Sequence, residues 1–272
     1  MLASMPIDYA RRLTGSDRTA EANAQLGYIL AFVAGATNAG GFLAVHQYTS
    51  HMTGIASSMA DSLALGQWDV ALSGLGGILF FLLGAMLSSI LVNYARRREL
   101  SSVYAIPLLL EATLLLCFGV AGARLQQVHT LFVPATVMLL CFIMGLQNAL
   151  ISKVSRSEIR TTHITGTITD IGIELGRLLY WNHPVAAGPK VLASRPRLRL
   201  LSTLASSFFV GGVAGALGFK YVGFLCTVPL AAALVILACV PAVDDLLGPK
   251  RNELGQPSSS KDSKTPSSRA SL

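Results

Sequence analysis

The chain has 272 residues, of which 52% are hydrophobic and only 13% are Asp, Glu, Lys or Arg, and its mean hydropathy is +0.57. Ordinary soluble domains carry roughly 25% charged residues. This composition excludes disordered, collagen-like and disulfide-scaffold proteins, and it predicts an all-α integral membrane protein. The net charge of +7 lies in short segments between apolar runs, so we expect it to orient the chain in a membrane and not to bind nucleic acid.

Six apolar stretches are long enough to cross a bilayer, whose hydrocarbon core of about 30 Å requires about 20 residues of helix. They are residues 25–45, 70–94, 103–123, 131–151, 200–219 and 221–243, and their only acidic or basic residue is Glu111. Two further segments, 51–66 and 163–181, are too short or too polar to be assigned by length. The Ser-, Pro- and Lys-rich segment 248–272 predicts a disordered cytoplasmic tail.

The distribution of basic residues decides between two topologies, because Lys and Arg accumulate on the cytoplasmic side. If both short segments cross the membrane, giving eight membrane helices, seven of the 21 basic residues fall outside. If neither crosses, only Arg124 and Lys220 fall outside. We therefore expect six transmembrane helices, two re-entrant segments and both termini in the cytoplasm, with eight membrane helices as the alternative.

Two motifs, GxxNA and HxTG, each occur twice and in the same order, which indicates a duplicated unit. The first copies are Gly35–Ala39 and His51–Gly54, and the second copies are Gly145–Ala149 and His163–Gly166. Downstream of each HxTG motif, a glycine-rich span contains a Phe-Phe pair, at residues 80–81 and 208–209.

The duplication divides the chain into a cytoplasmic N-terminal segment (1–24), a first membrane repeat (25–123), a second membrane repeat (131–243) and the tail. Each repeat contains three spans and one re-entrant segment, and an odd number of crossings inserts the second copy upside down relative to the first. The predicted fold is therefore a 3+3 inverted repeat, an architecture associated with transporters whose solute site lies near the membrane midplane.

Each HxTG motif predicts a half-helix that begins inside the membrane. Thr53 and Thr165 are expected to cap these helices, since a threonine oxygen can accept hydrogen bonds from amides two or three residues later. Gly54 and Gly166 would let the backbone approach another chain or a solute closely. The N–H groups at a helix start suit an anion or another polar solute. The alternative is that these small residues only permit tight helix packing.

An asparagine recurs late in the first span of each repeat. Asn38 and Asn148 are expected to face the bundle interior, where they contact the solute or a neighbouring carbonyl, because an unbonded amide is costly in lipid. His51 and His163 could gate the site, relay protons or satisfy backbone groups. The predicted substrate-binding residues are Asn38, Thr53, Gly54, Asn148, Thr165 and Gly166.

Acidic residues at membrane depth are candidates for proton coupling. Asp170, Glu174 and Arg177 share one face of a predicted helix, so we expect an ion pair between Glu174 and Arg177. Asp61 and Asp170 have no partner nearby in sequence and are better coupling candidates. Glu111 is expected to be a protonated acid hydrogen-bonded between helices. The gating or proton-coupling candidates are His51, His163, Asp61, Asp170 and Glu174.

Other patterns predict packing and membrane contacts. Gly172-x-x-x-Gly176 and Gly211-x-x-x-Gly215 are expected to let helices approach closely. Two basic clusters, residues 96–98 and 195–199, are interpreted as topology anchors that could also bind anionic lipid headgroups. No nucleotide-binding, metal-protease or serine-hydrolase motif occurs, so we expect no cofactor and no metal. The expected partners are the bilayer and a small polar or anionic solute, and a second copy of the chain in a homo-oligomer is a further candidate.

The run GATNAGGFLAVHQYTSHMTG, followed by MGLQNALISK and TTHITG, resembles the YoaK family of small multi-pass membrane proteins. The likeness covers residues 27–243, and the paired HxTG motifs are its specific part. It implies a bacterial inner-membrane location and a permease-like role without an established substrate. The family usually has Asp in place of Asn38 and Asn in place of Ile55, so this chain lacks the family's charge at position 38.

The sequence therefore predicts a transporter or channel for a small polar or anionic solute, with its site at the midplane between inverted repeats. Two alternatives stay open. One is an intramembrane enzyme that uses His51, His163 and nearby acids as metal ligands or as acid and base. The other is a non-catalytic membrane assembly partner, which would have dry, packed HxTG segments.

Overall fold

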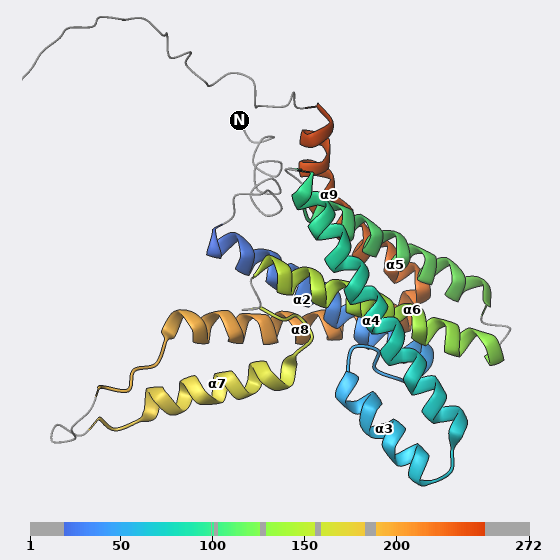
Figure 1. Ribbon diagram of the computed structural model, residues 1–272, viewed down its shortest axis with the longest axis horizontal. Helices are drawn as coiled ribbons and strands as arrows, with labels where there is room; N and C mark the ends of the chain where they lie inside the picture. Colours follow the sequence, from blue (N-terminus) through green and yellow to red (C-terminus); the bar gives the residue numbers. More distant parts are fainter. Residues whose placement is uncertain are drawn as a thin grey trace, which may run out of the picture.

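The computed structural model describes residues 19–98, 100, 103–125, 129–155, 159–182 and 189–247. The predicted tail lies outside these residues, as does nearly all of the predicted N-terminal segment. All regular secondary structure in the described part of the chain is helical (Figure 1). The helices are α2 (Ala20–Val45), α3 (Met52–Ala64), α4 (Trp68–Arg97), α5 (Ala105–Leu125), α6 (His129–Val154), α7 (Ile164–Leu179), α8 (Arg195–Val222) and α9 (Thr227–Leu247), with a short 3₁₀ helix, η1 (Gly223–Cys226), before α9.

The long helices follow the predicted apolar stretches, and each HxTG motif lies at the start of a short helix, α3 or α7. Five segments of the described residues are long and apolar enough to cross a membrane. They are Ala20–Val45, Trp68–Arg97, Ala105–Ala123, Val133–Val154 and Arg195–Cys239. The last of these joins α8, η1 and part of α9, a region that the sequence divides into two predicted spans at Lys220.

Two helix crossings form the largest contacts of the bundle: α2 packs on α8, and α4 packs on α6. At the first crossing, a Cβ added to Gly35 of α2 would overlap the backbone carbonyl of Phe208 on α8. At the second, a Cβ added to Gly145 of α6 would overlap the carbonyl of Phe81 on α4. Only glycine allows the two backbones to lie this close, because any side chain would push them apart.

At each of these two crossings, a second glycine on the other helix also lies against a backbone carbonyl. Gly211 of α8 lies against the carbonyl of Phe32 on α2, and Gly84 of α4 lies against the carbonyl of Phe142 on α6. Gly215 also lies against α2, at Ala36, so the predicted packing role of the Gly211 and Gly215 pattern is confirmed.

The matching prediction for α7 is wrong within the described residues. A Cβ added to Gly172 or to Gly176 would meet no atom within 4 Å. The reason is that α7 packs on α8 through its other face, which carries the buried Thr167 and Glu174. A small-xxx-small spacing therefore permits close approach but does not by itself bring a second helix to that face.

The distribution of exposed apolar side chains matches a lipid environment. Leu26 and Leu30 of α2 and Met144 of α6 are buried in the apolar core, whereas Leu82 of α4 and Phe209 of α8 are exposed. Many other large apolar side chains of α4 and α8 are also exposed. Apolar patches of this extent are rare on soluble monomers. Together with the apolar helices, they identify a multi-pass membrane protein.

Candidate functional site

The segment between α2 and α3 folds back along α2. Ser50 donates two hydrogen bonds to the Oδ1 atom of Asn38, one from its hydroxyl at 2.9 Å and one from its backbone N–H at 3.3 Å. Asn38 lies seven residues before Val45, the last residue of α2. Since a helix rises 1.5 Å per residue, the segment returns about 10 Å along α2 before α3 begins.

The segment between α6 and α7 repeats this geometry. The Thr162 hydroxyl donates to the Oδ1 atom of Asn148 at 2.8 Å, and the Asn148 side-chain amide donates to the carbonyl of Met144 at 2.9 Å. Asn148 lies six residues before Val154, where α6 ends. Both asparagines therefore hold the residue that directly precedes the HxTG histidine.

The histidines, and not the threonines, are the residues that precede the short helices. α3 begins at Met52 and α7 at Ile164, with His51 and His163 as N-caps, and neither cap makes a side-chain hydrogen bond. The prediction that Thr53 and Thr165 cap these helices is wrong, because both lie inside the first turn, where their own N–H groups are among those a cap would satisfy.

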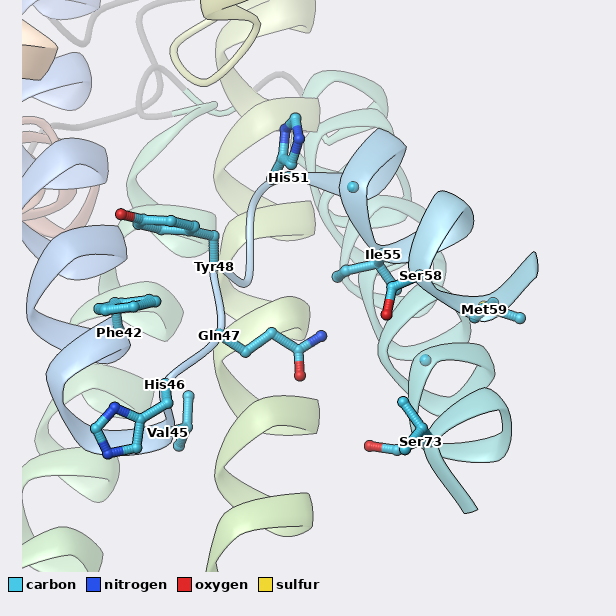
Figure 2. A pocket seen from close by; sticks show the side chains of 13 residues that line it. Phe42, Val45, His46, Gln47, Tyr48, His51, Ile55, Ser58, Met59 and Ser73 are labelled. Carbon is cyan, nitrogen blue, oxygen red and sulfur yellow. The ribbon is translucent and has the colours of Figure 1, made fainter. Parts of the chain in front are cut away.

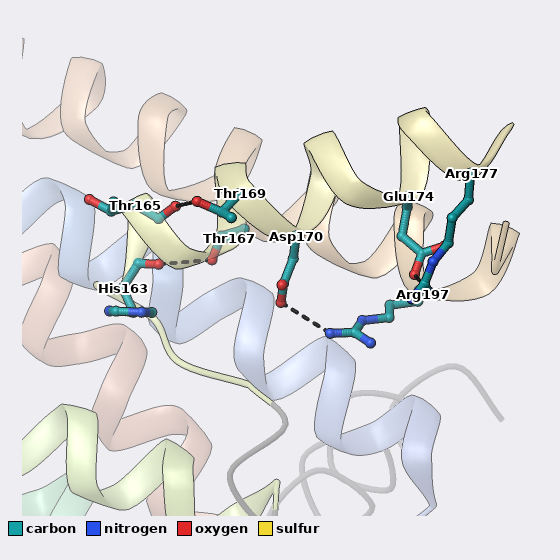
Figure 3. Close-up of polar contacts among 8 residues, drawn as sticks. All are labelled: His163, Thr165, Thr167, Thr169, Asp170, Glu174, Arg177 and Arg197. Carbon is teal, nitrogen blue, oxygen red and sulfur yellow. Dashed lines mark hydrogen bonds and ion pairs between the residues drawn. The ribbon is translucent and has the colours of Figure 1, made fainter. Parts of the chain in front are cut away.

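Threonine hydroxyls near the start of α7 donate to backbone carbonyls four residues earlier and do not cap the helix (Figure 3). Thr167 donates from Oγ1 to the carbonyl of His163 at 3.1 Å, and Thr169 donates from Oγ1 to the carbonyl of Thr165 at 2.9 Å. Thr165 is exposed, as is Thr53 in α3. The two predicted threonines thus keep their hydroxyls outside the packed interior of the chain.

The glycine of each HxTG motif makes room for the histidine of the same motif. A Cβ added to Gly54 would overlap the imidazole of His51, and a Cβ added to Gly166 would overlap the imidazole of His163. Residues three apart face each other on a helical turn, so the spacing places the ring over the glycine. This contact gives a physical reason for the recurrence of both residues in the two motif copies: a side chain at the glycine would displace the ring.

A pocket of about 390 Å³ opens beside the first HxTG motif (Figure 2). Its walls come from the end of α2, the returning segment, α3 and α4, and they include His51 and Gly54 of the predicted site. Gln47 extends across it toward α3 and α4. Its polar lining residues are His46, Gln47, Tyr48, His51, Ser58 and Ser73, and no Asp, Glu, Lys or Arg in the described part of the chain lines it.

Sequence reasoning missed several of these residues. His46, Gln47 and Tyr48 have no counterpart in the second motif copy, so the repeat gave them no weight. Thr49 and Thr161 were also missed: both hydroxyls are buried and have no hydrogen-bond partner within the described residues. A signal for these two was present, since a threonine stands two residues before the histidine in both copies.

The acidic candidates of the second repeat form ion pairs (Figure 3). Arg177 donates to Glu174 at 2.8 Å, which confirms the predicted pair. The other oxygen of Glu174 accepts the backbone N–H of Ser194 at 2.8 Å. Asp170, which has no partner nearby in sequence, pairs with Arg197 of α8 at 3.1 Å. Asp61 lies on α3 and forms no ion pair in the described part of the chain.

The predicted binding residues fall into two groups, one for each repeat. α3 packs on α4, whereas α7 packs on α8. In Figure 1 the two short helices diverge, and their N-terminal ends are turned toward the middle of the molecule. Asn38 and Gly54 therefore belong to one group, and Asn148 and Gly166 to the other.

A buried polar contact joins three helices in the bundle interior. The side-chain amide of Gln147 on α6 donates to Glu111 Oε1 on α5 at 2.8 Å and to the carbonyl of Leu30 on α2 at 3.3 Å. Glu111 is fully buried, and its interhelical hydrogen bond is the one that the sequence predicts. Among the described residues, no three His, Cys, Asp or Glu side chains are grouped to hold a metal ion.

Comparison with known proteins gives one family. The family model described as "Protein of unknown function (DUF1275)" matches residues 26–240. No curated protein and no solved structure gives a match. The match begins within α2, ends within α9 and includes both HxTG motifs, which agrees with the resemblance seen in the sequence. The chain belongs to the DUF1275 family of proteins of unknown function.

Proposed function

We propose that this protein is a transporter or channel for a small polar or anionic solute in the bacterial inner membrane. The observation that carries the proposal is the repeated fold-back, in which Ser50 binds Asn38 and Thr162 binds Asn148. Each fold-back leads into a short helix, α3 or α7, which we take to be a re-entrant half-helix. Irregular backbone at membrane depth persists only where it is buried in protein or lines a wet cavity.

An inverted repeat is the arrangement that we propose for the two halves. In its support, Gly35 against Phe208 and Gly145 against Phe81 are the same contact with the repeats exchanged. The contacts of Gly84 and Gly211 exchange in the same way. With three spans in each repeat and both termini in the cytoplasm, the exchange turns the second copy over. α3 would then enter from the outside and α7 from the cytoplasm.

The pocket beside His51 is the solute site that we propose for the first repeat. Its volume is in the range of small-molecule sites, roughly 300–1,000 Å³. His46, Gln47, Ser58 and Ser73 offer both donors and acceptors to a polar solute. Asn148, Thr165 and Gly166 would serve the equivalent half-site in the second repeat.

Proton coupling is assigned to the acids and histidines of the two half-helices. Asp61 has no ionic partner within the described residues, so its carboxylate is available for a proton or cation. Asp170 and Glu174 would have to release Arg197 and Arg177 before they bind a cation. We therefore rank Asp61 first among the coupling candidates.

The test is solute uptake by purified protein in liposomes, driven in turn by a pH gradient and by a membrane potential. A panel of small neutral, zwitterionic and anionic metabolites is used. We expect uptake of at least one class, and we expect Gly54→Leu to abolish it by displacing His51 into the pocket. Gly172→Leu, at a position with open space, is the matched control and should retain uptake. No uptake of any solute by the wild-type protein would contradict the proposal.

A further inference from the structure

The two hairpins formed by the short helices have similar tips. The chain has only two tryptophans, and each stands at one tip: Trp68 after α3 and Trp181 after α7. Their exposed fractions are 65% and 82%. Exposed leucines accompany them, Leu65 at the first tip and Leu179 at the second. Tryptophan beside exposed apolar side chains is typical of the membrane–water interface.

The two tips differ in charge. The tip of α3 and α4 carries Asp61 and Asp69 and has no Lys or Arg between them. Over the matching stretch, the tip of α7 and α8 carries one acid, Glu174, and three basic residues, Arg177, Lys190 and Arg195, and its ends are brought together by α7 packing on α8. The apolar anchor is thus common to both hairpins, whereas the positive charge belongs to one. Of the two tips, therefore, the α7–α8 tip is the one that offers basic side chains to an anionic partner.

A pocket lined by basic and polar side chains lies at the tip of α7 and α8. Its volume is about 420 Å³, and its lining includes Arg177, Tyr180, Asn182 and Arg195. Asn182 makes two hydrogen bonds to Val191, donating to its carbonyl at 3.0 Å and accepting from its N–H at 2.9 Å. These bonds hold the two walls of the pocket in a defined geometry.

A buried carboxylate fixes one of the two arginines. Glu174 binds Arg177 through one oxygen and the backbone of Ser194 through the other. A guanidinium has five N–H donors, so Arg177 keeps donors for a further ligand after this pairing. Arg195, the first residue of α8, has no acidic partner within the described residues. Within the described residues, the pocket therefore has one arginine paired with a carboxylate, Arg177, and one without an acidic partner, Arg195.

We propose that this pocket binds the phosphate of an anionic phospholipid headgroup. Arg195 and the remaining donors of Arg177 would contact the phosphate, and Tyr180 would lie beside the headgroup. The exposed Leu178 and Leu192 line the pocket and would contact the acyl chains. These apolar neighbours are the reason for assigning a lipid and not a soluble phosphate, which gains nothing from them.

The two tryptophans allow a direct test. A Trp68→Phe variant leaves Trp181 as the sole tryptophan, and a Trp181→Phe variant leaves Trp68. Each is reconstituted in phosphatidylcholine vesicles that contain brominated phosphatidylglycerol or, in a parallel set, the same fraction of brominated phosphatidylcholine. We expect Trp181 to be quenched at least twofold more by the anionic lipid, and Trp68 to show no preference.

Charge variants then assign the preference to the pocket. In the Trp68→Phe background, Arg195→Gln should remove the preference of Trp181, and Arg195→Lys should retain most of it. Lys220→Gln, at the other end of α8, is the matched control and should change nothing. Equal quenching of Trp181 by both lipids, or equal loss in Lys220→Gln, would overturn the proposal. Loss of the preference on adding inorganic phosphate would show a soluble-anion site instead. None of these measurements requires transport.

Discussion

Gln147 of α6 donates a hydrogen bond to Glu111 of α5 at 2.8 Å, and both side chains are completely buried. The same amide also reaches the carbonyl of Leu30 on α2, so one glutamine links three helices. Glu111 Oε2 and Gln147 Oε1 have no partner within the described residues. A polar contact in this position depends on both partners being present, because each is isolated from water.

We expect Gln147→Leu to destabilise the protein by about 1–3 kcal/mol, since it leaves the buried Glu111 carboxyl without its amide donor and removes a second hydrogen bond from the Leu30 carbonyl. Glu111→Gln should cost less, because an amide oxygen of the same shape still accepts from Gln147. Thermal unfolding in detergent measures both. The control is Thr113→Ala, which removes a hydroxyl that bonds only to Leu109 of its own helix. Equal shifts for Gln147→Leu and Thr113→Ala would contradict the prediction.

Alanine substitutions should have opposite effects on stability at glycines in helix crossings and at glycines beside open space. Gly84→Ala and Gly211→Ala each place a Cβ against a backbone carbonyl, so we expect a loss of about 1–3 kcal/mol, the usual cost of overpacking. Gly172→Ala and Gly176→Ala should be neutral or stabilising by up to about 1 kcal/mol, because alanine favours helix and has open space. Unfolding temperatures compare the two pairs. A destabilised Gly172→Ala would indicate a helix contact outside the described chain.

The histidine and glycine of each HxTG motif should be energetically coupled. Gly54→Ala is expected to destabilise the protein because its Cβ overlaps the His51 imidazole. His51→Ala should remove this penalty, so the double variant is more stable than the two single effects sum to. Coupling of about 0.5–3 kcal/mol is usual for residues in contact. A double-mutant cycle measures it, the cycle at His163 and Gly166 is its internal replicate, and additive effects at both motifs would refute the contact.

The two asparagines should respond differently to aspartate. Within the described residues, Asn38 only accepts hydrogen bonds, both from Ser50, so Asn38→Asp keeps both bonds. Asn148 also donates to Met144, so Asn148→Asp loses one bond. Hydrogen exchange of the two returning segments checks this. We expect protection to persist in Asn38→Asp and to fall in Asn148→Asp, with both alanine variants as the reference for full loss.

The hairpin tips should lie on opposite sides of the membrane. In a background without native cysteines, Gln67→Cys and Leu192→Cys place thiols at exposed tip positions. A membrane-impermeant maleimide added outside intact cells should label Gln67→Cys and should label Leu192→Cys only after permeabilisation. Labelling of both from the outside would exclude the six-span topology with two re-entrant segments.

The sequence by itself determined the features that depend on local chemistry. Hydropathy located the long helices, because the side chains of a helix themselves determine whether it is more stable in lipid or in water. The pair of Glu174 and Arg177 was predictable because residues three apart share a helical face. The duplicated motifs located both short helices, because a repeated polar and glycine-containing pattern between apolar spans marks the same break in each repeat.

The tertiary structure decided which helix faces pack against each other. Two glycine pairs have the same sequence spacing but different surroundings: Gly211 lies against α2, whereas Gly172 has open space beside it. Asp170 forms an ion pair with Arg197 of another helix, which the sequence did not predict. The N-cap of α3 is His51 and not the predicted Thr53. Each outcome depends on a neighbour distant in sequence or on the path of a returning segment. Local patterns state what a residue is able to contact, and only packing selects the partner.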